Sequence, residues 1–117
     1  MSLESDLYTL LNQACPRVYP DYAPTGTAKP FVTWSIIGGS PLNPLGKTTP
    51  NRRQAVAQIN VWSETRIEAN GMMLQIDELM RETSLFDALP SGEMMTIVDA
   101  ETDLRGAIQD FRINGFR

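Results

Sequence analysis

A long alternating segment that runs straight into an amphipathic one constrains this chain more than any other feature. In residues 53–63 the odd positions are small or aliphatic and the even positions are mostly polar. The odd set is Ala55, Ala57, Ile59 and Val61, and the even set is Gln54, Gln58 and Asn60, with Val56 and Trp62 as apolar exceptions. Alternation with a period of two indicates a strand with one packed face. At about 3.3 Å per residue the segment spans about 36 Å, so we expect a central strand.

The residues that follow predict a helix that begins with a capping box. The Thr65 hydroxyl would accept one orphan backbone N–H, and the Glu68 carboxylate would reach back to another. One apolar stripe then recurs at helical spacing, made of Ala69, Met72, Met73, Ile76, Leu79 and Met80. Gly71 weakens the helix by about 1 kcal/mol relative to alanine. We expect this stripe and the odd face of the strand to bury each other, with no catalytic group on either.

Shorter patterns complete the expected fold. Ser2 predicts the N-cap of a first helix that Pro16 ends, and a turn-rich passage covers residues 17–30. Further strands are predicted over 31–37, 94–99 and 107–113, and 83–92 is predicted to be a loop that packs Leu85, Phe86 and Leu89 onto the core. The order is α-β-β-α-β-β. We therefore predict an α+β fold, an antiparallel four-stranded sheet with two helices on one face, in a single domain over residues 1–117.

Residues 38–51 predict a projecting arm. This stretch holds three glycines and three prolines, and a connection this long is unusual inside a compact domain. Leu42 and Leu45 are its only large apolar residues, which suggests insertion into a neighbouring subunit. Lys47, Arg52 and Arg53 form a basic cluster toward its base, and that cluster is either solvated or in contact with an acidic partner.

Composition narrows the class of protein. The chain has 117 residues and a net charge of −4, which argues against a nucleic-acid-binding protein and against sequence-specific recognition of nucleic acid. One cysteine, Cys15, excludes an intrachain disulfide, and we interpret it as a buried structural residue. We expect no secretory signal and no membrane-spanning segment, and hence synthesis in a cytoplasm.

The sequence offers no recognisable set of catalytic residues. It contains no histidine, the commonest general base and metal ligand. Residues 99–103 resemble the start of a calcium loop, but Leu104 occupies the position where that loop needs glycine. The string 46–48 lacks the upstream glycine of a phosphate-binding loop and precedes no helix. We predict no catalytic, cofactor or metal site, and therefore no enzyme.

Three segments resemble a known family. They are Arg17-Val18-Tyr19-Pro20 with the prolines up to Pro30-Phe31-Val32, then Gln58-Ile59-Asn60-Val61-Trp62-Ser63 with the helix behind it, and finally Asp103-Leu104 with Gln109-Asp110-Phe111-Arg112-Ile113. In order and spacing the chain resembles the small tail-completion, or tail terminator, proteins of long-tailed bacteriophages. The resemblance covers nearly the whole chain, and its motifs are structural rather than chemical.

The resemblance implies a structural protein of the virion tail. Such a protein forms a ring of identical subunits, a hexamer among the candidate orders, which caps the tail tube and joins it to the head connector. The implied partners are the chain itself, the tail tube protein and the connector protein, and the implied place is the host cytoplasm during assembly and then the tail. Two alternatives remain open from the residues alone: a small soluble enzyme, and a ligand-binding or regulatory α+β domain acting as a monomer or dimer.

Overall fold

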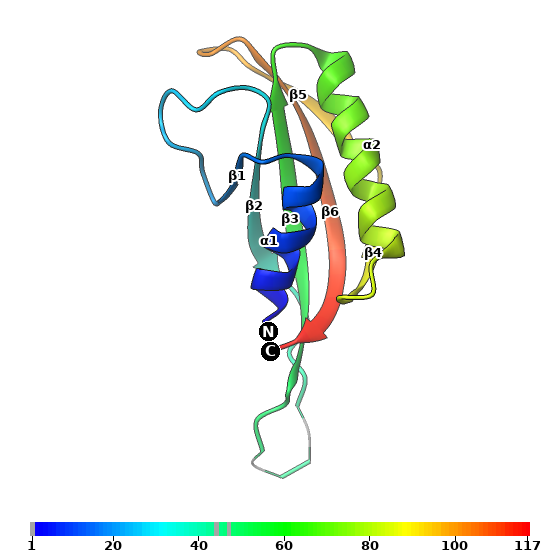
Figure 1. The fold of residues 1–117 in the computed structure, drawn as a ribbon. Coiled ribbons are helices and arrows are strands. Elements are labelled where there is room, and N and C mark those ends of the chain that lie inside the picture. Colours follow the sequence, from blue (N-terminus) through cyan, green and yellow to red (C-terminus); the bar gives the residue numbers. More distant parts are fainter. Residues whose placement is uncertain (1, 44, 47) are drawn as a thin grey trace.

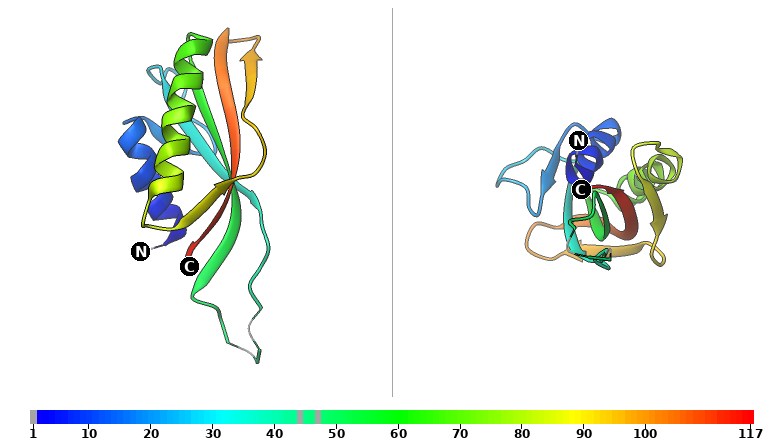
Figure 2. Two further views of the ribbon diagram at one scale, coloured as in Figure 1. Left: turned by 90° about the vertical axis from the view of Figure 1, so that its right-hand side faces the viewer. Right: turned by 90° about the horizontal axis from the view of Figure 1, so that it is seen from below.

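The structure is a computed structural model that describes residues 2–43, 45–46 and 48–117. Its helices and strands follow one another as α1 (Leu3–Ala14), β1 (Val18–Pro20), β2 (Phe31–Gly38), β3 (Arg52–Ser63), α2 (Arg66–Glu82), β4 (Asp87–Pro90), β5 (Met95–Asp99) and β6 (Leu104–Phe116). Both helices cover the same face of a twisted sheet, as Figures 1 and 2 show. The α+β class and the two helices on one face are confirmed.

The sheet is larger than predicted, and it is mixed. It has six strands in the order β1-β2-β3-β6-β4, and β5 pairs with the remaining length of β6. β1 runs parallel to β2, and every other pair is antiparallel. The prediction of four antiparallel strands was therefore wrong in number and in one direction. β1 and β4 are only three and four residues long and each includes a proline, so neither showed a strand pattern.

The central strand is β3, as the alternation predicted. It pairs with β2 on one side and with β6 on the other, and its twelve residues are in continuous register with β6 from Arg52↔Phe116 to Ser63↔Arg105. Ala57, Ile59 and Val61 are fully buried beneath the helices. The predicted packed face is confirmed.

The core lies between the two helices and this face of the sheet. It holds Leu3, Leu7 and Leu11 from α1, Ala69, Met73, Ile76 and Met80 from α2, and Ala107, Phe111 and Ile113 from β6. Cys15 is also buried, and its Sγ lies 3.5 Å from the carbonyl oxygen of Pro30. The apolar stripe predicted for the second helix therefore does cover the strands, and α1 covers them with its own leucines.

The caps differ from the expectation in one contact. The Ser5 N–H donates to Ser2 Oγ at 3.2 Å, and the Glu68 N–H donates to Thr65 Oγ1 at 3.2 Å, so both predicted N-caps are confirmed. The Glu68 carboxylate does not return to the Thr65 backbone. It accepts instead from the hydroxyl of Ser63, the buried last residue of β3, and so ties the strand to the start of the helix.

Leu89 corrects another expectation. Leu85 and Phe86 pack against the core as predicted, but Leu89 is 60% exposed. The reason is the pairing of β4 with β6, which sets Ala88 opposite the buried Ile113 and Leu89 opposite Arg112. Because successive side chains of a strand point to opposite faces, Leu89 lies on the face of the sheet that the helices leave uncovered.

Candidate functional site

The described residues of the segment 39–51, called the arm below, extend past the end of the sheet. Figure 1 shows this segment projecting from β2 and β3 beyond both chain termini. Leu45 is 99% exposed, while Leu42 is half-buried against the arm's own base. Among the described residues, none of the backbone hydrogen bonds outside helices and strands joins two residues of the arm's outer part, 39–50. The described residues of this segment therefore make few contacts with one another.

Two glycines set the direction in which the arm leaves the sheet. The β2–β3 pairing is irregular between Ile36 and Gly38, and both Gly38 and Gly39 have positive φ, 141° and 139°. A Cβ on Gly39 would lie 2.6 Å from the Cα of Ala55, closer than real contacts allow. Only glycine therefore fits where the arm crosses β3.

The two arginines at the base of the arm already have partners within the chain. Arg52 donates through Nε to Asn114 Oδ1 at 3.1 Å and lies over the ring of Phe116, 5.3 Å from its centroid. Arg53 donates through Nη1 to a carboxylate oxygen of Glu4 at 3.0 Å. Both arginine side chains remain about one-third exposed. Lys47, the third member of the predicted cluster, lies outside the described residues.

A hollow at the root of the arm was not predicted from the sequence. It forms on the helix-free face where β3, β6 and β4 meet, and Gly39 and Ser40 close one side of it. Val56 of β3, Arg112 of β6 and the edge strand residues Ala88 and Leu89 line the rest. These residues come together only through the registers Val56↔Arg112 and Leu89↔Arg112, which join distant parts of the chain. No local signal could have found them.

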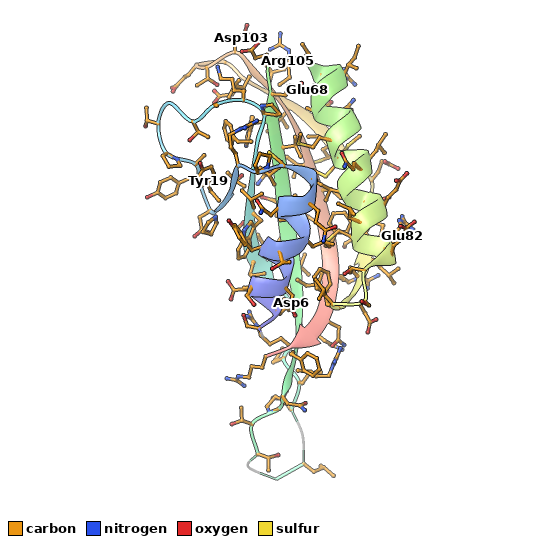
Figure 3. The ribbon with its side chains drawn as sticks, in the orientation of Figure 1. Asp6, Tyr19, Glu68, Glu82, Asp103 and Arg105 are labelled. Atoms are coloured by element: carbon orange, nitrogen blue, oxygen red, sulfur yellow. The ribbon has the colours of Figure 1, made fainter. Side chains whose placement is uncertain are left out.

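The acidic residues at 99–103 lie at the opposite end of the molecule. Figure 3 shows Asp103 and Arg105 at the tip of the β5–β6 hairpin, far from the arm. The Glu101 N–H donates to Asp99 Oδ1 at 3.0 Å, and this hydrogen bond, with one from Thr102, lowers the pKa of Asp99. Asp103 pairs with Arg105 at 2.9 Å. The carboxylates of Asp99 and Asp103 therefore both interact with neighbouring residues of this hairpin.

The described residues bring together no set of three or more histidine, cysteine, aspartate or glutamate side chains suited to a metal ion. Within the same residues, no helix is both long and apolar enough to cross a membrane. The contact surface of the arm and the hollow at its root are therefore the features of this chain that best fit a functional site.

Comparison with solved structures identifies the fold. Twenty-nine chains of solved structures match, and one of them, which carries only a sequence identifier as its name, aligns over 99% of this chain and 97% of its own with a TM-score of 0.52. At 11% identity that likeness shows the fold alone. A search of curated protein sequences finds no match.

A family comparison is more specific. The model of the family described as "Tail completion protein gp17" matches residues 3–114, from the first residue of α1 almost to the end of β6. The three segments that resembled tail-completion proteins all lie inside this match. The chain therefore belongs to this family of phage tail completion proteins.

Proposed function

We propose that this protein assembles as a ring of identical subunits on the end of the finished tail tube, stops its polymerisation and presents a surface to the head connector. Membership of the tail completion family supports a role at the tail. The observation that supports a ring is the arm, which carries a leucine 99% exposed to solvent and packs little against its own chain.

Ordering an arm of this kind costs conformational free energy, which contacts with another subunit can offset. Ordering the backbone of one residue costs about 1–2 kcal/mol, and an arm with few internal contacts recovers little of that alone. An arm that reaches from one subunit to a different surface on the next makes a head-to-tail contact, and such contacts close into rings. Assembly would take place in the host cytoplasm, with the tail tube protein and the connector protein as further partners.

Light scattering across a range of protein concentrations tests the ring. We expect a single assembled mass that is a small multiple of 13.0 kDa and that dissociates on dilution. A monomer at every concentration would contradict the ring and would favour the ligand-binding alternative.

Addition of the protein to polymerising tail tubes should fix their length, and tubes that continue to grow would contradict the capping role.

The same proposal gives the protein a structural role without catalysis. It rests on the absence of histidine from the sequence and on the family to which the chain belongs. Stoichiometric metal uptake together with a metal-dependent hydrolytic activity would contradict this part of the proposal, whatever the assembly state.

A further inference from the structure

We infer that the hollow on the helix-free face, where β3, β6 and β4 meet, receives the arm tip of a second copy of this chain, with Leu45 as the inserted residue. The inference rests on the proposed ring and names the surface that the arm contacts. It connects two surface features of the chain: the exposed Leu45 on the arm and the hollow on the helix-free face of the sheet.

The donor side of this contact is the tip of the arm. Single exposed leucines are common on protein surfaces. Leu45 differs because its side chain is 99% exposed and lies on a projecting segment. Figure 2 shows the arm leading away from the helices and from the rest of the sheet. Removing this side chain from water is favourable only if another molecule covers it.

The acceptor side is apolar along its walls and polar at its rim. Val56 and the 60% exposed Leu89 supply aliphatic surface, and Asp87 and Arg112 stand beside them. β4 ends the strand order of the sheet, so within the part of the chain that the structure describes one side of its backbone has no strand neighbour. An aliphatic side chain carried on an extended segment fits such a surface, since it can fill the hollow while its backbone runs beside the edge strand.

The dimensions favour a contact between subunits. The segment 39–51 has about six residues available in each direction, so its chain can reach about 20 Å at about 3.3 Å per residue. The molecule is 27 Å and 22 Å across its two shorter axes, so the arm can span nearly the width of a neighbour. The arm leads away from the hollow at its own root, which leaves that hollow open to a different copy.

Charge supports the same pairing. The only charged residue in the sequence of the arm is the cationic Lys47, whereas the whole chain carries a net charge of −4. The side chain of Asp87 at the rim of the hollow is 90% exposed, and its ion pair with Arg52 is long at 3.8 Å. A cationic arm is therefore complementary to the negative net charge of the chain, and the rim of the hollow offers it the Asp87 carboxylate beside Arg112.

Cysteine pairing between copies tests the contact directly. The variants Leu45→Cys and Leu89→Cys are each made alone, mixed in equal amounts and oxidised; the native Cys15 is buried and does not compete. A disulfide needs Cβ atoms about 3.5–4.5 Å apart, so only docked tips will react efficiently. We expect a cross-linked pair in which peptides containing positions 45 and 89 are joined, identified by mass spectrometry. Because each cysteine is on a different molecule, this product cannot form within one chain.

The control cysteine lies at the far end of the molecule. Leu45→Cys mixed with Glu101→Cys, an exposed residue of the β5–β6 hairpin, should give at most one-tenth of that product. Equal yields from both mixtures would overturn the inference, because they would reflect random collision. A double variant that combines Leu45→Cys and Leu89→Cys in one chain should give a ladder of products larger than dimers.

Three further outcomes separate this inference from the ring itself. A parent protein that assembles normally while positions 45 and 89 fail to cross-link would overturn the docking site and leave the ring intact. A double variant that stops at covalent dimers would support docking but contradict a ring. A parent that is monomeric at every concentration would overturn both.

Substitutions provide an independent readout in the native assembly. Leu45→Asp and Leu89→Asp should each raise the concentration needed for half-assembly at least tenfold, with the thermal unfolding of the monomer unchanged. Ile67→Asp, at an 87% exposed position of α2, is the matched control and should assemble like the parent. Normal assembly of both Leu45→Asp and Leu89→Asp would contradict the inference.

Discussion

Ile59 and Gln58 are neighbours on β3 with opposite consequences for stability. Ile59 is fully buried under the helices, whereas Gln58 is half-buried on the helix-free face. Ile59→Ala should lower the free energy of unfolding by about 2–5 kcal/mol, because it leaves a cavity in the core. Gln58→Ala should change it by about 0.5 kcal/mol or less. Urea denaturation of the monomer measures both, and equal large losses would mean that the two faces are packed alike.

Gly106 and Gly71 allow two effects of a Gly→Ala substitution on stability to be compared: steric crowding by neighbouring side chains, and reduced backbone flexibility. A Cβ on Gly106 would lie 2.9 Å from side-chain atoms of both Trp62 and Ile97, which meet above it on the helix-free face. A Cβ on Gly71 in α2 would meet nothing within 4 Å. Gly106→Ala should therefore destabilise by about 1–3 kcal/mol, and Gly71→Ala should stabilise by about 0.5–1 kcal/mol. Thermal unfolding measures both, and a stabilised Gly106→Ala would show that the Trp62 ring moves aside easily.

At the scale of elements, the arm should be separable from the fold. A variant in which a short Gly/Ser turn replaces residues 41–49 should fold as a monomer with nearly the parent's monomer stability, because none of the described residues of this segment belongs to the buried core. It should fail to form rings or to complete tails. Circular dichroism and light scattering distinguish these effects. Assembly and tail completion equal to the parent's would make the arm a passive loop and refute its role in the ring.

The long elements were predictable because their patterns are local. The alternation in β3 and the stripe in α2 each repeat over several turns or residue pairs, so the packed faces follow from the residue order alone. β1 and β4 are too short for such a pattern, and each forms as a strand through its pairing with a longer neighbour. Val18 pairs with Val32 and Ala88 with Ile113, and neither contact leaves a signal near the short strand.

The candidate site also has one part that the sequence predicted and another part that it could not predict. Glycines and prolines in residues 38–51 predicted the arm, since they prevent regular structure wherever the segment lies. Arg52 and Arg53 were predicted as contacts for another subunit, and that remains a prediction, with Asn114 and Glu4 as their partners inside the chain. The hollow could not be predicted, because β3, β4 and β6 contribute its walls from three separate stretches of sequence.

At the scale of the whole molecule, the proposed ring would be built from an elongated subunit that leaves one face of its sheet free for contacts. The described chain measures 51 × 27 × 22 Å, and one face of its sheet lacks any helix. A protein that gains contacts only as a ring is stabilised by mass action, so its apparent stability depends on its own concentration. Each tenfold rise in concentration should add at most about 1.4 kcal/mol per subunit.

Thermal unfolding at several concentrations turns this dependence into a prediction. For a domain of this size about 1 kcal/mol shifts the melting temperature by roughly 4 °C, so the parent should melt roughly 3–5 °C higher for each tenfold rise in concentration. The arm-replaced variant has no ring to dissociate, and its melting temperature should stay constant over the same range. Leu89→Asp should behave like the arm-replaced variant, since it removes the surface to which we assign the arm. A parent whose melting temperature is independent of concentration would show that it unfolds as a monomer, and the ring would then have no thermodynamic support.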